Sequence, residues 1–122
     1  MAAVTSTLSL TSTDLTTDSL SVSVTNNLSG INTGGMTRIN VAAENIGASE
    51  TLAAHGSYAA TTYVYVKNCD TGADNIYLVL AGADNMVIAP GEWVWFPWAT
   101  VADIKIWATT AGTVAEYGIF GA

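Results

Sequence analysis

Short stretches in which apolar and polar residues alternate, separated by turns rich in Gly, Asn and Asp, recur along the chain. Residues 20–25 (LSVSVT), 36–41 (MTRINV) and 61–67 (TTYVYVK) all alternate in this way. A period of two is typical of strands with one face against a core, and no stretch has the 3.6-residue period of an amphipathic helix. The sequence therefore predicts an all-β fold, an antiparallel β-sandwich or jelly-roll-like arrangement of about eight strands.

The eleven aromatic residues are confined to the C-terminal part of the chain, where Tyr58 is the first. Residues 1–35 are rich in Ser and Thr and hold only isolated Leu, Val and Ile, so we expect an N-terminal arm or edge strands there and a β-sandwich domain over residues 36–122. Within these regions, residues 26–35 (NNLSGINTGG) are predicted to form a loop, and residues 82–85 (GADN) a turn. Half-apolar strands such as residues 20–25 have little to pack with unless a more hydrophobic surface covers them.

Charge is scarce and unevenly distributed. Only 11% of the residues are charged, against about 25% in an ordinary soluble domain. Ten carboxylates face three cations, Arg38, Lys67 and Lys105, for a net charge of −7. Three scattered cations cannot form the basic patch that nucleic acids or anionic membranes require, so we expect neither partner. The low charge indicates that part of the surface is covered by other subunits.

The lack of long apolar runs and the single cysteine indicate where the protein is made. No apolar run approaches the 18 residues of a membrane span, and the start of the chain lacks the pattern of a secretion signal. A single cysteine, Cys69, cannot form an internal disulfide. These features favour synthesis in a reducing cytoplasm.

Candidate catalytic groups are few. His55 is the only histidine; it lies near Ser57 but without a nucleophile motif, so we interpret it as an exposed loop residue. Cys69 precedes an aspartate, which disfavours a reactive thiolate. A pair of carboxylates for glycoside hydrolysis could be drawn from Glu92, Asp103 and Glu116, but their spacing in the sequence singles out no pair. The sequence therefore predicts no catalytic residues and no enzyme activity.

Cofactor and metal sites have little support either. Asp70, Asp74 and Asp84 lie in turns and could bind calcium, but their spacing is not that of a known calcium loop, and Asp is common in ordinary turns. Glycine-rich nucleotide-binding motifs are absent. We expect no cofactor and no metal.

A tryptophan-rich segment stands out above this background. Residues 93–98 (WVWFPW) together with Trp107 place four tryptophans within 15 residues. In a strand Trp93 and Trp95 share one face, and the other face is taken by Val94, Phe96 and Trp98. Three interpretations remain open: core packing, a protein interface, and a platform on which sugar rings stack.

The order of these segments resembles that of small virion proteins of tailed bacteriophages. The resemblance rests on TTYVYVKN, a turn-rich stretch, an apolar strand, PGEWVWFPW, a further strand and a terminal VAEYGIFG, after a Ser/Thr-rich opening. It is nearest to head decoration, or cement, proteins. It implies a β-rich fold, no enzyme activity, self-association, often as trimers, and docking on the major capsid protein at the outer surface of the head.

A physical interpretation of the chain agrees with that role and names candidate contact residues. The predicted interface residues are Leu20, Val22, Val24, Trp93, Trp95, Trp98 and Trp107. The alternatives are a phage tail component and a carbohydrate-binding module that uses residues 93–98.

Overall fold

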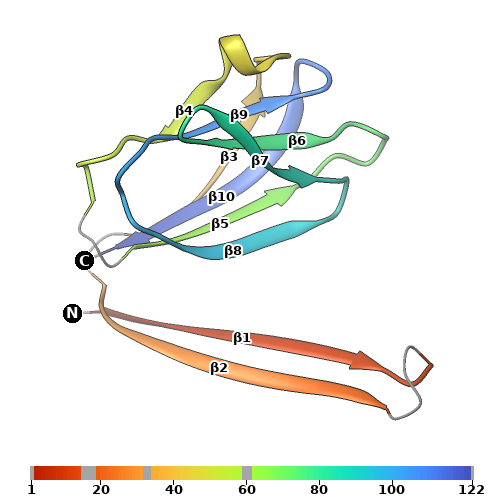
Figure 1. The fold of residues 1–122 in the computed structure, drawn as a ribbon, viewed down its shortest axis with the longest axis vertical. Coiled ribbons are helices and arrows are strands. Elements are labelled where there is room, and N and C mark those ends of the chain that lie inside the picture. The colour runs from red at the N-terminus through yellow and green to blue at the C-terminus, as the bar shows by residue number, and fades with distance from the viewer. Residues whose placement is uncertain (1, 15–18, 32–33, 59–61, 122) are drawn as a thin grey trace. The chain divides into compact units, whose positions relative to one another are not determined.

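The computed structural model describes residues 2–14, 19–31, 34–58 and 62–121. The chain forms two units, Met1–Asn32 and Thr33–Ala122, each described here by itself. Nearly all of the described structure is antiparallel β-sheet, which confirms the all-β prediction (Figure 1). None of the described residues belongs to a helix long and apolar enough to cross a membrane.

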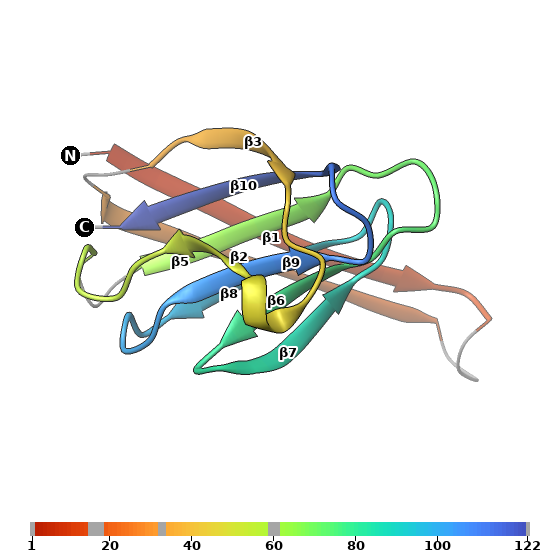
Figure 2. The same cartoon turned by 90° about the horizontal axis from the view of Figure 1, so that it is seen from above.

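The N-terminal unit is a two-stranded hairpin. Strand β1 (Ala2–Ser12) pairs with β2 (Leu20–Ile31) in antiparallel register over nearly its whole length (Figure 2). The prediction of a loop over residues 26–35 is wrong at residues 26–31, because β2 continues through them. Cross-strand pairing with β1 keeps these turn-forming residues in the strand, with a bulge at Gly30 (φ 73°). Thr5 Oγ1 donates a hydrogen bond of 3.0 Å to Asn27 Oδ1. Residues 32–33 of the predicted loop lie outside the described part of the chain.

The second unit is a sandwich of two four-stranded sheets. The first sheet has the order β3-β10-β5-β8 and the second β4-β9-β6-β7 (Figure 1). A short 3-10 turn, η1 (Ile46–Ala48), precedes β4. The strands of the first sheet are β3 (Met36–Val41), β10 (Thr113–Gly121), β5 (Thr62–Asn68) and β8 (Trp93–Trp98). Those of the second are β4 (Glu50–Ala53), β9 (Ile104–Ala108), β6 (Ile76–Leu80) and β7 (Ala83–Ile88).

The core lies between the two sheets and is aliphatic. Val64 and Val66 of β5 are fully buried, because alternate residues of a strand point to the same side. The second sheet contributes Ile76, Leu78, Ile88, Ile104 and Ile106, which are also fully buried. The alternation in residues 61–67 separates the two sides of β5, and the structure shows that the valine side enters the core.

The β6–β7 turn differs from the prediction. Residues 82–85 were predicted to form a turn, but β7 already begins at Ala83. The chain reverses one residue earlier, on Ala81 (φ 54°) and Gly82 (φ 80°). Two successive residues with positive φ are typical of the tight two-residue turn whose twist matches a hairpin. Strand β4, which has no clear alternation, was also not predicted.

Candidate functional site

The outer side of the β3-β10-β5-β8 sheet carries a cluster of aromatic side chains. Because Val64 and Val66 face the core, their neighbours Tyr63 and Tyr65 project from the opposite side. Register places Trp95 directly opposite Tyr65 on β8. We call this surface the aromatic face, and its members are Tyr63, Tyr65, Trp93, Trp95 and Phe120.

Ring contacts hold the aromatic face together. Tyr63 stacks on Trp95, with ring centroids 5.5 Å apart and planes inclined by 18°. Trp95 also meets Phe120 of β10 at 5.9 Å with a 46° tilt. Offset and tilted pairs at these separations are favourable arrangements of aromatic quadrupoles. The three rings thus support one another across β5, β8 and β10.

Two glycines make room for the Phe120 ring. A Cβ on Gly118 would lie 2.7 Å from that ring and 2.8 Å from Met36 Sδ, and a Cβ on Gly34 would lie 2.6 Å from the ring. Carbon atoms do not approach this closely, so a larger residue at either position would displace Phe120. The ring therefore rests directly on glycine backbone, which fixes one end of the aromatic face.

A polar row borders the aromatic residues on the same side of the sheet. Arg38 Nε lies 3.2 Å from Glu116 Oε2, and register places Lys67 between Glu116 and Trp93. Two of the three cations of the chain thus lie here beside one carboxylate. The Tyr65 hydroxyl donates a hydrogen bond of 3.5 Å to Glu116 Oε1. Burial raises the pKa of Tyr65, and the negative charge of Glu116 raises it further.

The four tryptophans divide among three environments. Trp93, at 53% exposure, and the half-buried Trp95 belong to the aromatic face, as the alternation predicted. Trp98 is 6% exposed; it packs edge-on against Tyr58 inside the core and its Nε1 donates to the Ala102 carbonyl at 3.1 Å. Trp98 therefore does not contribute to the exposed surface.

Trp107 lies on the other sheet. It stacks on Tyr77 of β6 with centroids 4.0 Å apart and an angle of 7°, and its Nε1 donates to Asp84 Oδ1 at 2.8 Å. The remaining predicted interface residues belong to the N-terminal hairpin, where β2 carries Leu20, Val22 and Val24. The structure thus brings Trp93 and Trp95 together and buries Trp98. Trp107 lies on the other sheet, and the remaining predicted residues belong to the hairpin.

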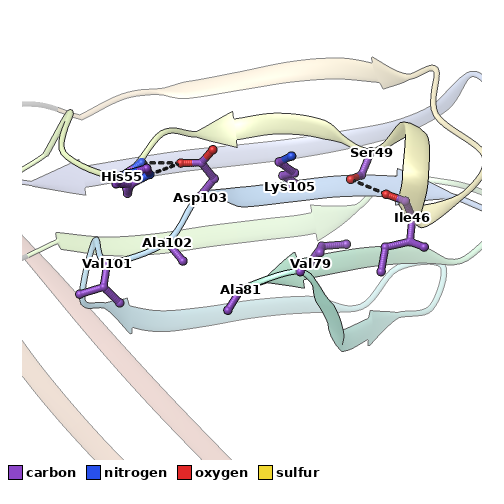
Figure 3. Close-up of a pocket in the computed structure, with 10 residues that line it drawn as sticks. Ile46, Ser49, His55, Val79, Ala81, Val101, Ala102, Asp103 and Lys105 are labelled. Atoms are coloured by element: carbon purple, nitrogen blue, oxygen red, sulfur yellow. Dashed lines mark hydrogen bonds and ion pairs between the residues drawn. The ribbon is translucent and has the colours of Figure 1, made fainter.

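A pocket of about 380 Å³ lies on the second sheet beside η1 (Figure 3). Its rim holds His55 and Asp103, whose side chains point toward one another. His55 Nδ1 is 2.6 Å from Asp103 Oδ1, and the His55 backbone N–H donates to the same oxygen at 2.9 Å. The backbone hydrogen bond, and after it the ring, lowers the pKa of the Asp103 carboxyl.

The sequence interpretation did not predict this pair of titratable partners. His55 and Asp103 were both noted, but nothing local to either predicts their contact, since they are 48 residues apart. A histidine held by a carboxylate can accept or release a proton at Nε2. Ser49 also lines the pocket. Its hydroxyl donates a hydrogen bond of 2.8 Å to the Ile46 carbonyl and not to His55.

The three aspartates considered for calcium have structural partners instead. Asp70 Oδ2 accepts from the backbone N–H groups of Gly72 and Asp74, and Asp74 Oδ1 accepts from the Thr109 and Thr110 hydroxyls. Asp84 Oδ1 accepts a hydrogen bond from Trp107 Nε1. No cluster of three or more His, Cys, Asp or Glu that could hold a metal occurs among the described residues.

Comparison with known proteins identifies no family for this chain. Neither the scan of protein-family models nor the search of curated proteins found a match to the sequence.

Proposed function

We propose that this chain is a non-enzymatic virion structural protein, a decoration (cement) protein that docks on the major capsid protein of a tailed bacteriophage. In this proposal it is made in the host cytoplasm, self-associates, with a trimer favoured, and stabilises the head from its outer surface. The observation that carries the proposal is the aromatic face, a half-exposed set of mutually packed rings bordered by a short row of charged residues.

The physical argument concerns what such a face does in water. Tyr and Trp bury a large area with few rotatable bonds, and together with Arg they dominate the energetics of protein interfaces. Trp93 remains 53% exposed although Trp95, two residues away, is braced by Tyr63 and Phe120. A preorganised face of this kind loses little conformational entropy when a partner covers it.

Electrostatics supports the same choice of surface. The chain carries a net charge of −7, yet Arg38 and Lys67 border the aromatic face and Glu116 lies between them in register. An acidic or neutral partner therefore meets less repulsion here than it would from the average charge of the chain. The N-terminal hairpin, with its uncharged strands, offers a second place for subunit contacts.

The test is binding of the purified chain to empty heads built from the cognate major capsid protein. Wild-type protein should cosediment with the heads and raise their resistance to heat or chelation. Trp93→Ala should weaken binding by about tenfold to a hundredfold, as loss of a central aromatic contact does. The matched control is Val87→Ala, because Val87 is similarly exposed, at 56%, but lies on β7 of the other sheet.

The two variants separate the possible outcomes. Binding lost in Trp93→Ala and retained in Val87→Ala supports docking through the aromatic face. Wild-type protein that does not bind heads overturns the decoration role, and equal binding by both variants overturns the assignment of the face. The mass of the unbound protein by light scattering tests the trimer separately.

A carbohydrate-binding function, in a tail protein or a free module, is the second candidate. The observation that favours it is the stack of Tyr63 on Trp95 beside an exposed Trp93, because flat rings on an open sheet suit stacking against sugar faces. Titration of tryptophan emission with a glycan panel distinguishes it. A saturable shift that Trp93→Ala removes would favour this candidate over head decoration.

A further inference from the structure

The N-terminal hairpin has one apolar face and one polar face. Register aligns Val4 with Leu28, Leu8 with Val24 and Leu10 with Val22, and residues directly opposite each other project to the same side. We call this side the hairpin apolar face; its apolar members are Val4, Leu8, Leu10, Leu20, Val22, Val24 and Leu28. Ser6, Ser12 and Asn26 lie on the same side, and Leu28, at 7% exposure, is already buried. The opposite side holds Thr5, Thr7, Ser9, Thr11, Ser21, Ser23, Thr25 and Asn27.

Cross-strand hydrogen bonds join side chains on the polar side, whereas the apolar side is open to water in its middle. Thr7 and Thr25 hydroxyls are 3.2 Å apart, which joins the two strands on the polar side. On the other side Leu8, Leu10 and Val24 are exposed by 40%, 47% and 56%. An isolated two-stranded hairpin is marginally stable in water, and covering one face with further strands is the usual remedy.

Charge restricts what can cover this face. Neither β1 nor β2 contains a charged residue, although the chain carries −7 overall. Two copies of so acidic a chain repel each other over most surfaces, but they can meet on uncharged strands without opposing like charges. A charged partner would gain nothing on this face. The chemistry that complements it is another uncharged aliphatic strand pair.

We propose that the hairpin apolar face is a self-association site whose occupant is the same face of another copy of this chain. Two hairpins then form a four-stranded sandwich with facing aliphatic side chains, at the spacing of about 10 Å between packed sheets. Three hairpins around a threefold axis hide the same residues. The contact is isologous or cyclic, so it closes instead of growing into a fibre.

The area of the hairpin apolar face indicates how strongly two copies should associate. Strands of 11 and 12 residues extend for about 36 Å at roughly 3.3 Å per residue, and two strands cover a width of about 10 Å. Because Leu28 at one end is already buried, each copy contributes at most roughly 350 Å², so that two copies bury at most roughly 700 Å², less than the ~1,200 Å² of a stable interface. The contact should be weak in solution and become tight where copies are held side by side.

This inference rests on the self-association in the proposed function, but it is tested without capsids. Sedimentation of the full-length chain from about 5 to about 500 µM should show reversible association. Val24→Lys places a charge in the apolar face and should weaken association at least about tenfold. Ser23→Lys adds the same charge one residue away on the polar side and should change association less than about twofold.

Folding of the variants is followed independently. All four tryptophans lie between residues 93 and 107, in the second unit, so their emission and thermal transition report on the sandwich and not on the hairpin. Both variants should match wild type in these measurements. Association that is equal in Val24→Lys and Ser23→Lys, or a wild-type chain that stays monomeric throughout, overturns the proposal.

Cross-linking gives a second result that does not depend on a disruptive change. In a Cys69→Ser background, Leu8→Cys places a thiol near the middle of the apolar face, where a twofold or threefold axis brings equivalent residues together. Mild oxidation should produce linked chains, and Thr7→Cys on the polar side should not. If Leu8→Cys links no better than Thr7→Cys, the hairpin is not the contact. Head binding measured separately then decides whether the proposed function stands without it.

Discussion

Asn68 joins the two sheets of the sandwich through a buried hydrogen-bonded side chain, and its removal should be costly. It is fully buried at the end of β5. Its Nδ2 donates to the Asp74 carbonyl at 2.8 Å and to the Ile88 carbonyl at 2.9 Å, and its Oδ1 accepts from the Asp70 N–H at 2.9 Å. One side chain thus links β5 of the first sheet to the end of β7 in the second.

Asn68→Ala leaves these three backbone groups without their partner. A buried polar group left unsatisfied costs about 1–3 kcal/mol. Ile88 is fully buried, so its carbonyl bears the larger cost, whereas Asp70 and Asp74 are partly exposed and can bond to water. We therefore expect the free energy of unfolding to fall by about 3 kcal/mol. For a domain of this size that corresponds to a Tm lower by roughly 12–24 °C.

The assay is urea unfolding followed by tryptophan emission, with the midpoint and slope fitted separately. Asn40→Ala on the exposed side of β3 is the matched control and should change stability by less than about 0.5 kcal/mol. A loss below about 1 kcal/mol for Asn68→Ala, with an unchanged slope, would refute the reasoning. It would mean that water or a shift of the turn satisfies the three groups as well as the asparagine does.

Three further changes test particular features of the sandwich. Ala81→Asn suits the positive φ of 54° better than alanine and should stabilise the β6–β7 turn by about 0.5–1 kcal/mol; no gain in Tm would contradict that account of the turn. Gly118→Ala brings a methyl group 2.7 Å from the Phe120 ring and should cost about 1–3 kcal/mol by thermal unfolding, while an unchanged Tm would show that the ring moves aside freely. Asp103→Ala removes the His55 contact. Because folding lowers the pKa of Asp103 below its ordinary 3.8, the contact stabilises the fold above that pH and the difference from wild type should vanish as pH falls through the lowered value; a difference that persists in strong acid would exclude this cause.

Local alternation predicted the facing of side chains better than it predicted where strands end. Trp93 and Trp95 were correctly placed on one side and Val94 and Phe96 on the other, because a strand has a strict period of two. The end of the second strand was missed, since residues 26–31 have turn-forming types that pairing with β1 keeps within the strand. Residue preference is a weak local effect that a neighbouring strand can override.

The candidate site could be predicted only in part. The tryptophan segment drew attention to Trp93 and Trp95, and its alternation put Trp98 on the opposite side, where the structure buries it. Nothing in the segment indicated that Tyr63 stacks on Trp95 or that Trp107 belongs to the opposite sheet. The pairing of His55 with Asp103 likewise has no local signature.

The sequence by itself determined the class of fold and the two sides of those strands whose residues alternate clearly, because both follow from the identity and spacing of neighbouring residues. Only the tertiary structure decided which strands lie side by side, and with that order the composition of the aromatic face and of the His55 pocket. The physical reason is that strand pairing joins distant segments. It depends on how whole sheets pack and loops close, and a single segment carries no record of its neighbour.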